Sequence, residues 1–157
     1  MKAVIVSGVP GTGKTFVAKR IAKQLKAQYM DVNNLIKENK LYNSYDKKFK
    51  SYVVDEKKFK KFFADLIKKS KKLLIIDSHL SHLIDRKYVK LCVITKCDLK
   101  VLKRRLMKRK WSKEKIKVNM ESEILDICYN EALENKHKIQ IIDTSKGLKD
   151  KRIVLKL

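Results

Sequence analysis

Glycine and proline are nearly absent from this chain of 157 residues, which holds four glycines and one proline. Most of them fall within six positions, as Gly8, Pro10, Gly11 and Gly13, and only Gly147 lies elsewhere. Glycine and proline are the residues that tight or left-handed turns require. Because the chain avoids them everywhere else, we expect its functional chemistry at this one turn.

Long apolar runs are also missing, since none approaches the roughly 18–20 residues that a membrane-spanning helix needs. The run at residues 3–6 is too short for the core of a signal peptide, and no small-residue cleavage site follows it. We therefore expect neither membrane insertion nor secretion, but a cytoplasmic protein, or a nuclear one if the source is a eukaryote. Hydrophobic residues make up 44% of the chain, which argues against wholesale disorder and predicts one domain with a substantial core.

Cysteine is scarce and odd in number, with Cys92, Cys97 and Cys128 and no Cys-x-x-Cys pair. Cys92 and Cys128 lie inside apolar segments, where a free cysteine behaves as a small buried hydrophobe. This interpretation is favoured over a redox or metal-binding role, and it indicates a reducing compartment.

Acidic residues are few, with 17 Asp and Glu against 40 Lys and Arg, for a net charge of +23. Of the basic residues 34 are lysines, an excess that genome or thermal bias produces as readily as a binding need. Residues 100–117 carry ten bases and one acid, whereas residues 118–135 carry five acids and no base. So dense a basic patch attracts polyanions such as nucleotides or rRNA, and a solvated lysine-rich helix surface is the alternative.

Apolar runs and amphipathic segments alternate along the chain. Strands of the kind that is buried on both faces are predicted at residues 3–6, 73–77, 89–95 and 139–142, with a shorter strand at 28–32. Apolar residues recur at helical spacing over residues 17–25, which predicts a helix there. Further helices are predicted after the capping residues Asp55, Asp98 and Ser112, and the one after Ser112 is expected to run as a single long helix through Cys128. This alternation predicts a single α/β domain with a mostly parallel sheet.

Residues 8–15, Gly-Val-Pro-Gly-Thr-Gly-Lys-Thr, match the phosphate-loop pattern G-x-x-x-x-G-K-[ST] in full, between a predicted strand and a predicted helix. Its glycines let backbone N–H groups turn inward around an anion, and the helix N-terminus adds its dipole. Lys14 is expected to place its charge on the β- and γ-phosphates of ATP, and the Thr15 hydroxyl to bind Mg²⁺. Thr12 is expected to shape the loop rather than to catalyse.

Asp77 ends the apolar strand that begins at residue 73. A carboxylate at the carboxyl end of a strand beside a phosphate loop can hold Mg²⁺, directly or through water. His79 and His82 follow directly, and His79 could orient a water or a substrate phosphate. A transition-metal site is the alternative, but no third nitrogen or sulfur ligand is near in sequence.

Three further groups of residues make the pattern specific: Asp77-Ser78-His79, Arg109-Lys110-Trp111-Ser112, and the segments at 41–46, 54–56 and 115–119. With these the sequence resembles the adenylate kinase 6-type P-loop proteins over nearly its whole length. The resemblance implies a P-loop NTPase fold of the nucleoside monophosphate kinase type, a three-layer α/β/α domain whose parallel five-stranded sheet has the order 2-3-1-4-5. It also implies a monophosphate-binding segment at about residues 31–54 and a lid at about 108–117 within one domain, residues 1–157.

The resemblance further implies the ligands and their contacts. Arg109 would contact ATP from the lid, Lys146 would contact or close over the adenine, and Asp77 and His79 would serve the Mg²⁺ site and ATP hydrolysis. The residues expected to bind ATP are therefore Gly8, Gly11, Thr12, Gly13, Lys14, Thr15, Phe16, Arg109 and Lys146. Those expected to take part in catalysis are Lys14, Asp77, His79 and Arg109, and those expected to hold the metal are Thr15 and Asp77.

Several positions depart from the family pattern, among them Asn33 and Asn34, which replace a more usual Gly-Asp. Phe16 stands where relatives often have a second threonine, and Lys37 stands where an arginine commonly meets the acceptor phosphate. A lysine grips a phosphate less specifically than a forked guanidinium, so the acceptor preference stays open. Arg105 lies one helical turn before Arg109 and could either join it at the phosphates or anchor its helix.

Three functions are compatible with these features. The first is transfer of the γ-phosphate of Mg·ATP to AMP or another nucleoside monophosphate, with ATPase activity linked to small-subunit rRNA maturation. The second is mainly an ATPase switch in ribosome assembly, bound to a small-subunit ribosomal protein and in contact with rRNA. The third, a pure RNA-binding module, leaves the concentrated glycines unexplained.

Overall fold

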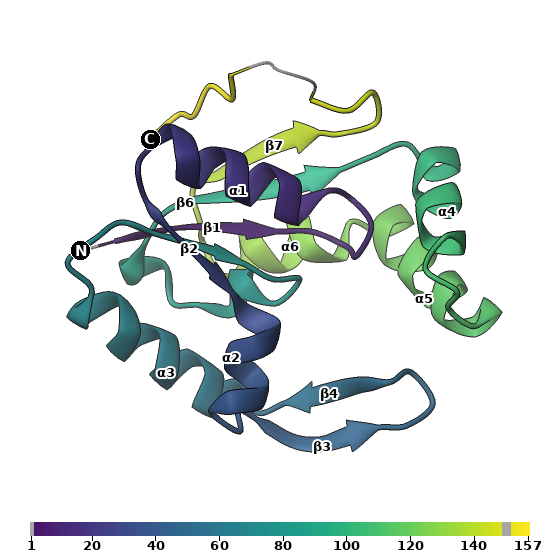
Figure 1. Cartoon of the computed structure of the whole chain (residues 1–157), viewed down its shortest axis with the longest axis horizontal. Helices are drawn as coiled ribbons and strands as arrows, with labels where there is room; N and C mark the ends of the chain where they lie inside the picture. Colours follow the sequence, from purple (N-terminus) through teal and green to yellow (C-terminus); the bar gives the residue numbers. More distant parts are fainter. Residues whose placement is uncertain (1, 149–151) are drawn as a thin grey trace.

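A parallel sheet of five strands forms the centre of the molecule in a computed structural model that describes residues 2–148 and 152–157 (Figure 1). The strands are β1 (Ala3–Ser7), β2 (Gln28–Asp31), β5 (Leu74–Asp77), β6 (Val89–Lys96) and β7 (Ile139–Asp143). They lie in the order β2-β5-β1-β6-β7, and every neighbouring pair is parallel. Numbered among themselves along the chain, they give the order 2-3-1-4-5, so the expected sheet is confirmed.

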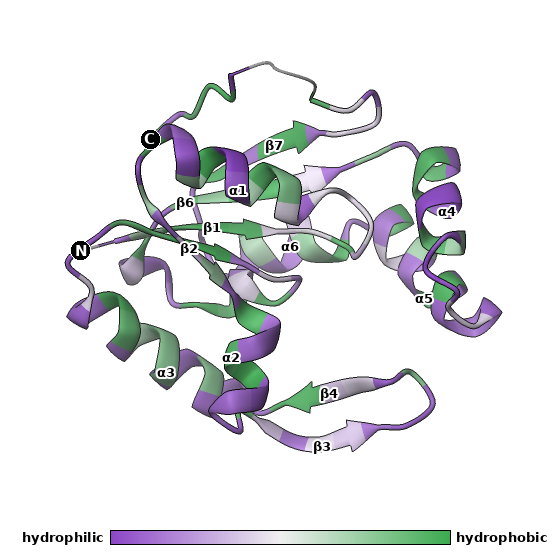
Figure 2. Ribbon diagram, in the orientation of Figure 1, coloured by the Kyte–Doolittle hydropathy of each residue, from purple (hydrophilic) through white to green (hydrophobic). Residues whose placement is uncertain are grey.

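Helices cover both faces of the sheet. Every residue of β1 and β5 is buried, so the apolar side chains on each face of these strands need a covering layer. On one face α1 (Lys14–Gln24) packs Val17 and Ile21 against Val4 and Val6. On the other face lie α3 (Glu56–Lys69) and α6 (Ile127–Glu134), where the fully buried rings of Phe59 and Phe63 join a second cluster. Figure 2 shows apolar and polar residues alternating along α1 and α3 beside the apolar strands. The three-layer α/β/α architecture is thereby confirmed.

The cysteines behave as expected, since Cys92, Cys97 and Cys128 are all free and buried. Within the described part of the chain, no helix combines the length and apolar character needed to cross a membrane.

One segment of secondary structure lacked a clear sequence signal. Between β2 and α3 the chain forms α2 (Val32–Glu38) and an antiparallel hairpin of β3 (Tyr42–Asp46) and β4 (Ser51–Val54). The hairpin projects as an arm separate from the main sheet (Figure 1). None of its strand residues is fully buried, so the hairpin has no apolar run that would mark it in the sequence.

The helices that flank the expected lid at residues 108–117 depart from expectation in one respect. Asp98 and Ser112 cap α4 (Leu99–Met107) and α5 (Lys113–Ile124) as expected. The prediction of one long helix from Ser112 through Cys128 is wrong, because α5 ends at Ile124 and α6 starts at Ile127. Between them Asp126 adopts φ 51°, in the left-handed region, and the Lys96 ammonium at the end of β6 binds its carboxylate. Lys96 also binds Glu123 at 2.7 Å, so a cation from the sheet fixes the break.

A buried histidine ties the sheet to α6 just behind the phosphate loop. His82 lies in a short 3₁₀ turn (Ser81–Leu83), where Nδ1 is 2.8 Å from Ser7 Oγ and Nε2 is 2.5 Å from Glu131 Oε2. A carboxylate can only accept, so neutral His82 donates from Nε2 and accepts from the Ser7 hydroxyl. His137 Nε2 lies 2.8 Å from the His82 carbonyl oxygen. Because both ring nitrogens of His82 are engaged, it is a structural residue and not a metal ligand.

This histidine cluster makes a prediction about pH and stability. Burial lowers the pKa of His82 and of His137 below the ordinary value. Below about pH 6.5 these histidines therefore bind protons in the unfolded chain but not in the folded one, so the free energy of unfolding falls as the pH falls. Each histidine can add at most about 1.4 kcal/mol per pH unit to this slope.

Denaturant unfolding at pH 7.5 and pH 5.5 measures the effect, and we expect lower stability at pH 5.5. The variant His137→Asn should show a flatter dependence. A free energy of unfolding that is constant or rises on acidification would contradict the structural role of these imidazoles.

Candidate active site

The turn that holds the glycines connects β1 to α1 and has the backbone that only glycine allows. Gly8 has φ 148°, and a Cβ there would lie 2.4 Å from Thr95 Oγ1 and 2.7 Å from the Thr95 carbonyl oxygen. Gly13, at φ 85°, is the left-handed residue from which α1 starts. The loop therefore brings its backbone N–H groups to the N-terminus of α1, an arrangement suited to a phosphate.

Thr12 has a structural side chain, as expected. It is fully buried, and its hydroxyl donates to the Val9 carbonyl oxygen at 2.6 Å and pairs with the Thr95 hydroxyl at 2.7 Å. Its backbone is engaged as well, because the Thr12 N–H donates to the Val9 carbonyl oxygen at 3.2 Å and the Thr12 carbonyl oxygen accepts from the Thr144 hydroxyl at 2.7 Å.

Lys14 lies over the loop, where its ammonium donates to the Val9 carbonyl oxygen at 3.2 Å. Burial lowers its pKa to about 8, although the negative charge of Asp77 opposes the shift. At pH 7 most of the lysine is still charged. An anion bound in the loop would restore the usual preference for the charged form.

Asp77 and Thr15 lie together at the carboxyl end of β5, as both would in a magnesium site. The Thr15 hydroxyl donates to Asp77 Oδ2 at 2.7 Å. Their oxygens are the hard ligands that Mg²⁺ prefers, so the donor set fits that ion. Tyr29 donates to the same oxygen at 2.9 Å. No local sequence pattern predicts this contact, because it depends on the pairing of β2 with β5. No group of three or more His, Cys, Asp or Glu that could hold a metal occurs among the residues described.

His79 stands two residues after Asp77, and its side chain faces the adjoining cavity. Partial desolvation by the cavity wall, and then the nearby charge of Lys14, lower the pKa of His79 below its usual range, although the residue stays exposed to solvent. The imidazole is therefore neutral at pH 7, with one nitrogen that can accept a hydrogen bond and one that can donate.

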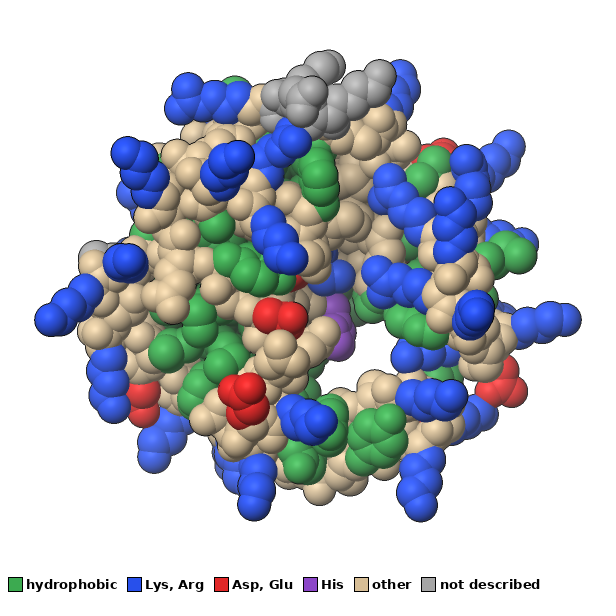
Figure 3. All heavy atoms as spheres, in the orientation of Figure 1, with side chains coloured by type: hydrophobic (Ala, Val, Ile, Leu, Met, Phe, Trp, Pro, Cys, Tyr) green, Lys and Arg blue, Asp and Glu red, His purple; other side chains and the backbone are tan. Residues whose placement is uncertain are grey.

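The main cavity, of about 650 Å³, lies between the phosphate loop, the hairpin and the lid, and Figure 3 shows the opening with a histidine at its edge. Basic side chains dominate its walls over the acids Asp31 and Asp77. The basic residues are Lys14, Lys37, Lys50, Arg109 and Lys115. This excess of positive charge suits an anionic substrate.

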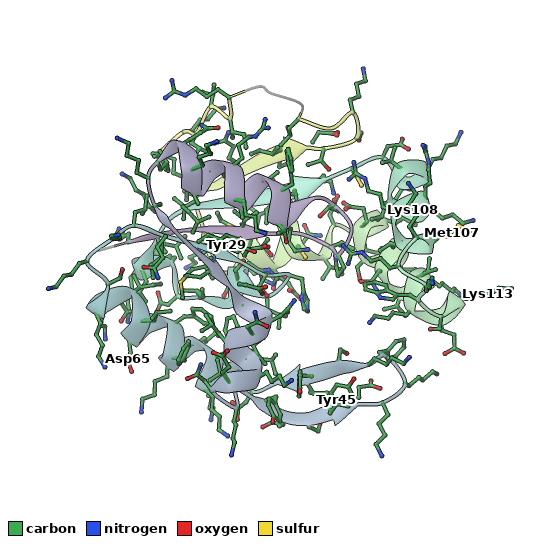
Figure 4. The ribbon with its side chains drawn as sticks, in the orientation of Figure 1. Tyr29, Tyr45, Asp65, Met107, Lys108 and Lys113 are labelled. Carbon is green, nitrogen blue, oxygen red and sulfur yellow. The ribbon has the colours of Figure 1, made fainter. Side chains whose placement is uncertain are left out.

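The two segments on either side of this cavity touch. Lys115 on α5 donates to the Phe49 carbonyl oxygen at the hairpin tip at 2.7 Å. The exposed pair Lys48–Glu114 adds little, because water screens it. Trp111, which also lines the cavity, has the Lys115 ammonium 4.1 Å from its ring centre. Other lid lysines face outward, such as Lys113, which projects from the outer end of the lid in Figure 4.

A second cavity, of about 450 Å³, lies on the other side of the phosphate loop. Gly11, Phe16 and Arg109 are among the residues that line it, so Arg109 faces both cavities. Phe16 is half exposed, with the Arg20 guanidinium 4.8 Å from its ring centre. Lys146 is exposed in the loop after β7 and is not among the residues lining either cavity, whereas the adjacent residues 147 and 148 line the second one.

Arg105 anchors its helix, and it also lines the second cavity. Its guanidinium donates to the Gly11 carbonyl oxygen at 3.2 Å and to the hydroxyl and carbonyl oxygen of Thr144 at 3.0 and 2.7 Å. These bonds fix α4 against the phosphate loop, one helical turn before Arg109. The alternative of a helix-anchoring residue is thus the one that the structure supports.

Comparison with known proteins agrees with this geometry. The AAA_18 family (AAA domain) matches residues 4–126. A protein of Methanocaldococcus jannaschii named "Putative adenylate kinase" is 35% identical over 142 residues, which is 90% of this chain and 76% of the relative. The "Adenylate kinase isoenzyme 6 homolog" of Schizosaccharomyces pombe is 36% identical over 132 residues, 84% of this chain and 74% of the relative.

Solved structures show the same fold at low identity. The shikimate kinase of Acinetobacter baumannii superposes with a TM-score of 0.61 at 14% identity, covering 89% of this chain and 83% of that one. The shikimate kinase of Bacteroides thetaiotaomicron gives 0.59 at 16% identity, covering 96% and 89%. Together with the matching relatives and the phosphate loop beside Asp77, these findings show that the chain belongs to the adenylate kinase 6-type family of P-loop kinases.

Proposed function

We propose that this protein transfers the γ-phosphate of Mg·ATP to AMP or another nucleoside monophosphate. The observation that carries the proposal is the pair of cavities on either side of the phosphate loop, with Arg109 lining both. A nucleoside monophosphate kinase needs two nucleotide sites whose phosphates meet at one positive centre. The names of the relatives favour AMP as the acceptor.

On the donor side, the loop backbone at residues 8–15 and the Lys14 ammonium hold the phosphates of ATP. The second cavity, beside Phe16, takes the nucleoside of ATP. Residues 147 and 148 line this cavity and Lys146 does not, so we assign the cover of the base to the loop at 147 and 148 rather than to the Lys146 side chain. Thr15 and Asp77 are the residues that would hold Mg²⁺, which when bound neutralises charge on the phosphates.

On the acceptor side, Lys37 and Lys50 extend from α2 and the hairpin into the main cavity. Their charges fit the phosphate of a monophosphate, and residues 31–54 form that wall. A phosphate monoester is already an anionic nucleophile, so no general base is required. The lid at residues 108–117 supplies positive charge and excludes water from the reacting groups.

The first test is ADP formation from Mg·ATP by purified protein, without acceptor and then with AMP or CMP, at near-physiological salt. We expect a monophosphate to raise ADP formation many-fold and to be phosphorylated itself, because the main cavity positions it as the attacking group. Slow ADP formation that no monophosphate changes would contradict the proposal.

The variant Lys14→Ala should lose ATP-dependent activity by roughly a thousandfold, because its charge stabilises the phosphoryl group in transfer. Lys23→Ala, an exposed lysine two turns along the same helix, is the matched control and should keep full activity. If Lys14→Ala retained turnover, the phosphate-loop assignment would be wrong.

Hydrolysis of ATP is a second candidate function, favoured by neutral His79 facing the main cavity near Lys14. An imidazole there can hold a water molecule for attack on the γ-phosphate. A small-subunit ribosomal protein and rRNA as partners of this activity rest on the family resemblance and on the basic lid, and on no particular contact among the described residues.

Replacement of His79 separates the two reactions. We expect His79→Ala to slow acceptor-free ATP hydrolysis roughly tenfold or more, and transfer to AMP much less, because only hydrolysis needs an oriented water. Both rates are measured on the same preparation. An equal loss in both would assign His79 a shared structural role.

A further inference from the structure

Tyr29 is placed by strand pairing beside the carboxylate of Asp77. Strand β2 lies at the edge of the sheet, with Tyr29 opposite Ile75 and Asp31 opposite Asp77. Side chains two positions apart on a strand share a face, so Tyr29 and Asp77 project from the same face, toward α1. Figure 4 labels Tyr29 over the sheet.

Two hydroxyl groups hold a single oxygen of this carboxylate. Tyr29 and Thr15 donate to Asp77 Oδ2 at 2.9 and 2.7 Å, from β2 and from α1. In the described ranges, 2–148 and 152–157, no hydrogen bond reaches Oδ1. Donors from two sides of one oxygen fix the rotation of the carboxylate and leave the other oxygen available.

Tyr29 is itself held in place. The Lys19 ammonium lies 5.4 Å from the centre of its ring, one helical turn after Thr15 on the same stripe of α1. The ring also packs against the apolar cluster under α1. Its hydroxyl is the donor of the hydrogen bond to Asp77 Oδ2, because a carboxylate oxygen only accepts.

We propose that Tyr29 is a positioning residue that orients the Asp77 carboxylate so that Oδ1 stays available to Mg²⁺, directly or through water. The inference rests on the proposed function, in which Thr15 and Asp77 hold that ion. Partners that orient a metal ligand typically change metal affinity 10–100-fold when they are removed. A tyrosine that merely joined β2 to β5 would leave magnesium binding unchanged.

The test is the affinity of the whole protein for a non-hydrolysable ATP analogue, measured by calorimetry in EDTA and in excess Mg²⁺. The ratio of the two dissociation constants reports magnesium binding and needs no catalysis. We expect Tyr29→Phe to lower this ratio roughly tenfold, with the affinity in EDTA unchanged. The control is Tyr88→Phe, the same change in the turn just before β6, at the end of that strand away from the phosphate loop. It should keep the wild-type ratio.

Asp77→Asn and the double variant Tyr29→Phe/Asp77→Asn complete the experiment. We expect the double variant to match Asp77→Asn alone, because the tyrosine acts through the carboxylate. A wild-type ratio in Tyr29→Phe, or an equal loss of affinity with and without Mg²⁺, overturns the inference while the magnesium site stands. A wild-type ratio in Asp77→Asn overturns the magnesium assignment itself, and phosphorylation of AMP, measured separately, then decides the proposed function.

Discussion

The close contact between the first glycine of the phosphate loop and β6 is the constraint on which the site depends. The chain leaves β1 so near Thr95 that any side chain at position 8 would overlap it. This contact turns the loop back over the end of the sheet and seats the Thr12 hydroxyl beside Thr95. Helix α1 must then start at Gly13, which brings Thr15 to the end of β5 and its Asp77. One tight contact thus places the loop, the N-terminus of α1 and the side-chain oxygens of Thr15 and Asp77 together.

The few arginines and the many lysines do different work around this loop. Arg105 uses its planar fork to join three oxygens of two separate loops in a fixed geometry, whereas a lysine acts as a point charge. Lysines act where a single charge suffices, as Lys96 does in fixing the break between α5 and α6 and Lys115 does at the hairpin carbonyl. The surplus of lysine on the surface therefore carries less information than these few placed cations.

The sequence was sufficient where local pattern and topology agree. Continuous apolar runs marked β1, β5 and β6, and parallel strands beside a phosphate loop imply that Asp77 ends next to Thr15. The break at Asp126 could not be foreseen, because the cation that fixes it comes from Lys96, thirty positions away. The contact of Tyr29 with Asp77 likewise depends on a strand register that no local pattern encodes. The hairpin strands were not predicted, because their side chains are half exposed and form no apolar run.

The contact between lid and hairpin bears on the balance between transfer and hydrolysis. Lys115 binds a backbone carbonyl of the hairpin, so protein atoms alone bridge the main cavity, and the bridge does not need an acceptor to form. An enzyme that closes only around its acceptor keeps water from ATP until that acceptor arrives. Under the proposed function, closure of the cavity and binding of the acceptor are therefore separate interactions, and both involve the hairpin wall. Neutral His79 faces the space they enclose, so the occupant of that space, a monophosphate or a water molecule, determines which reaction follows under the proposed function.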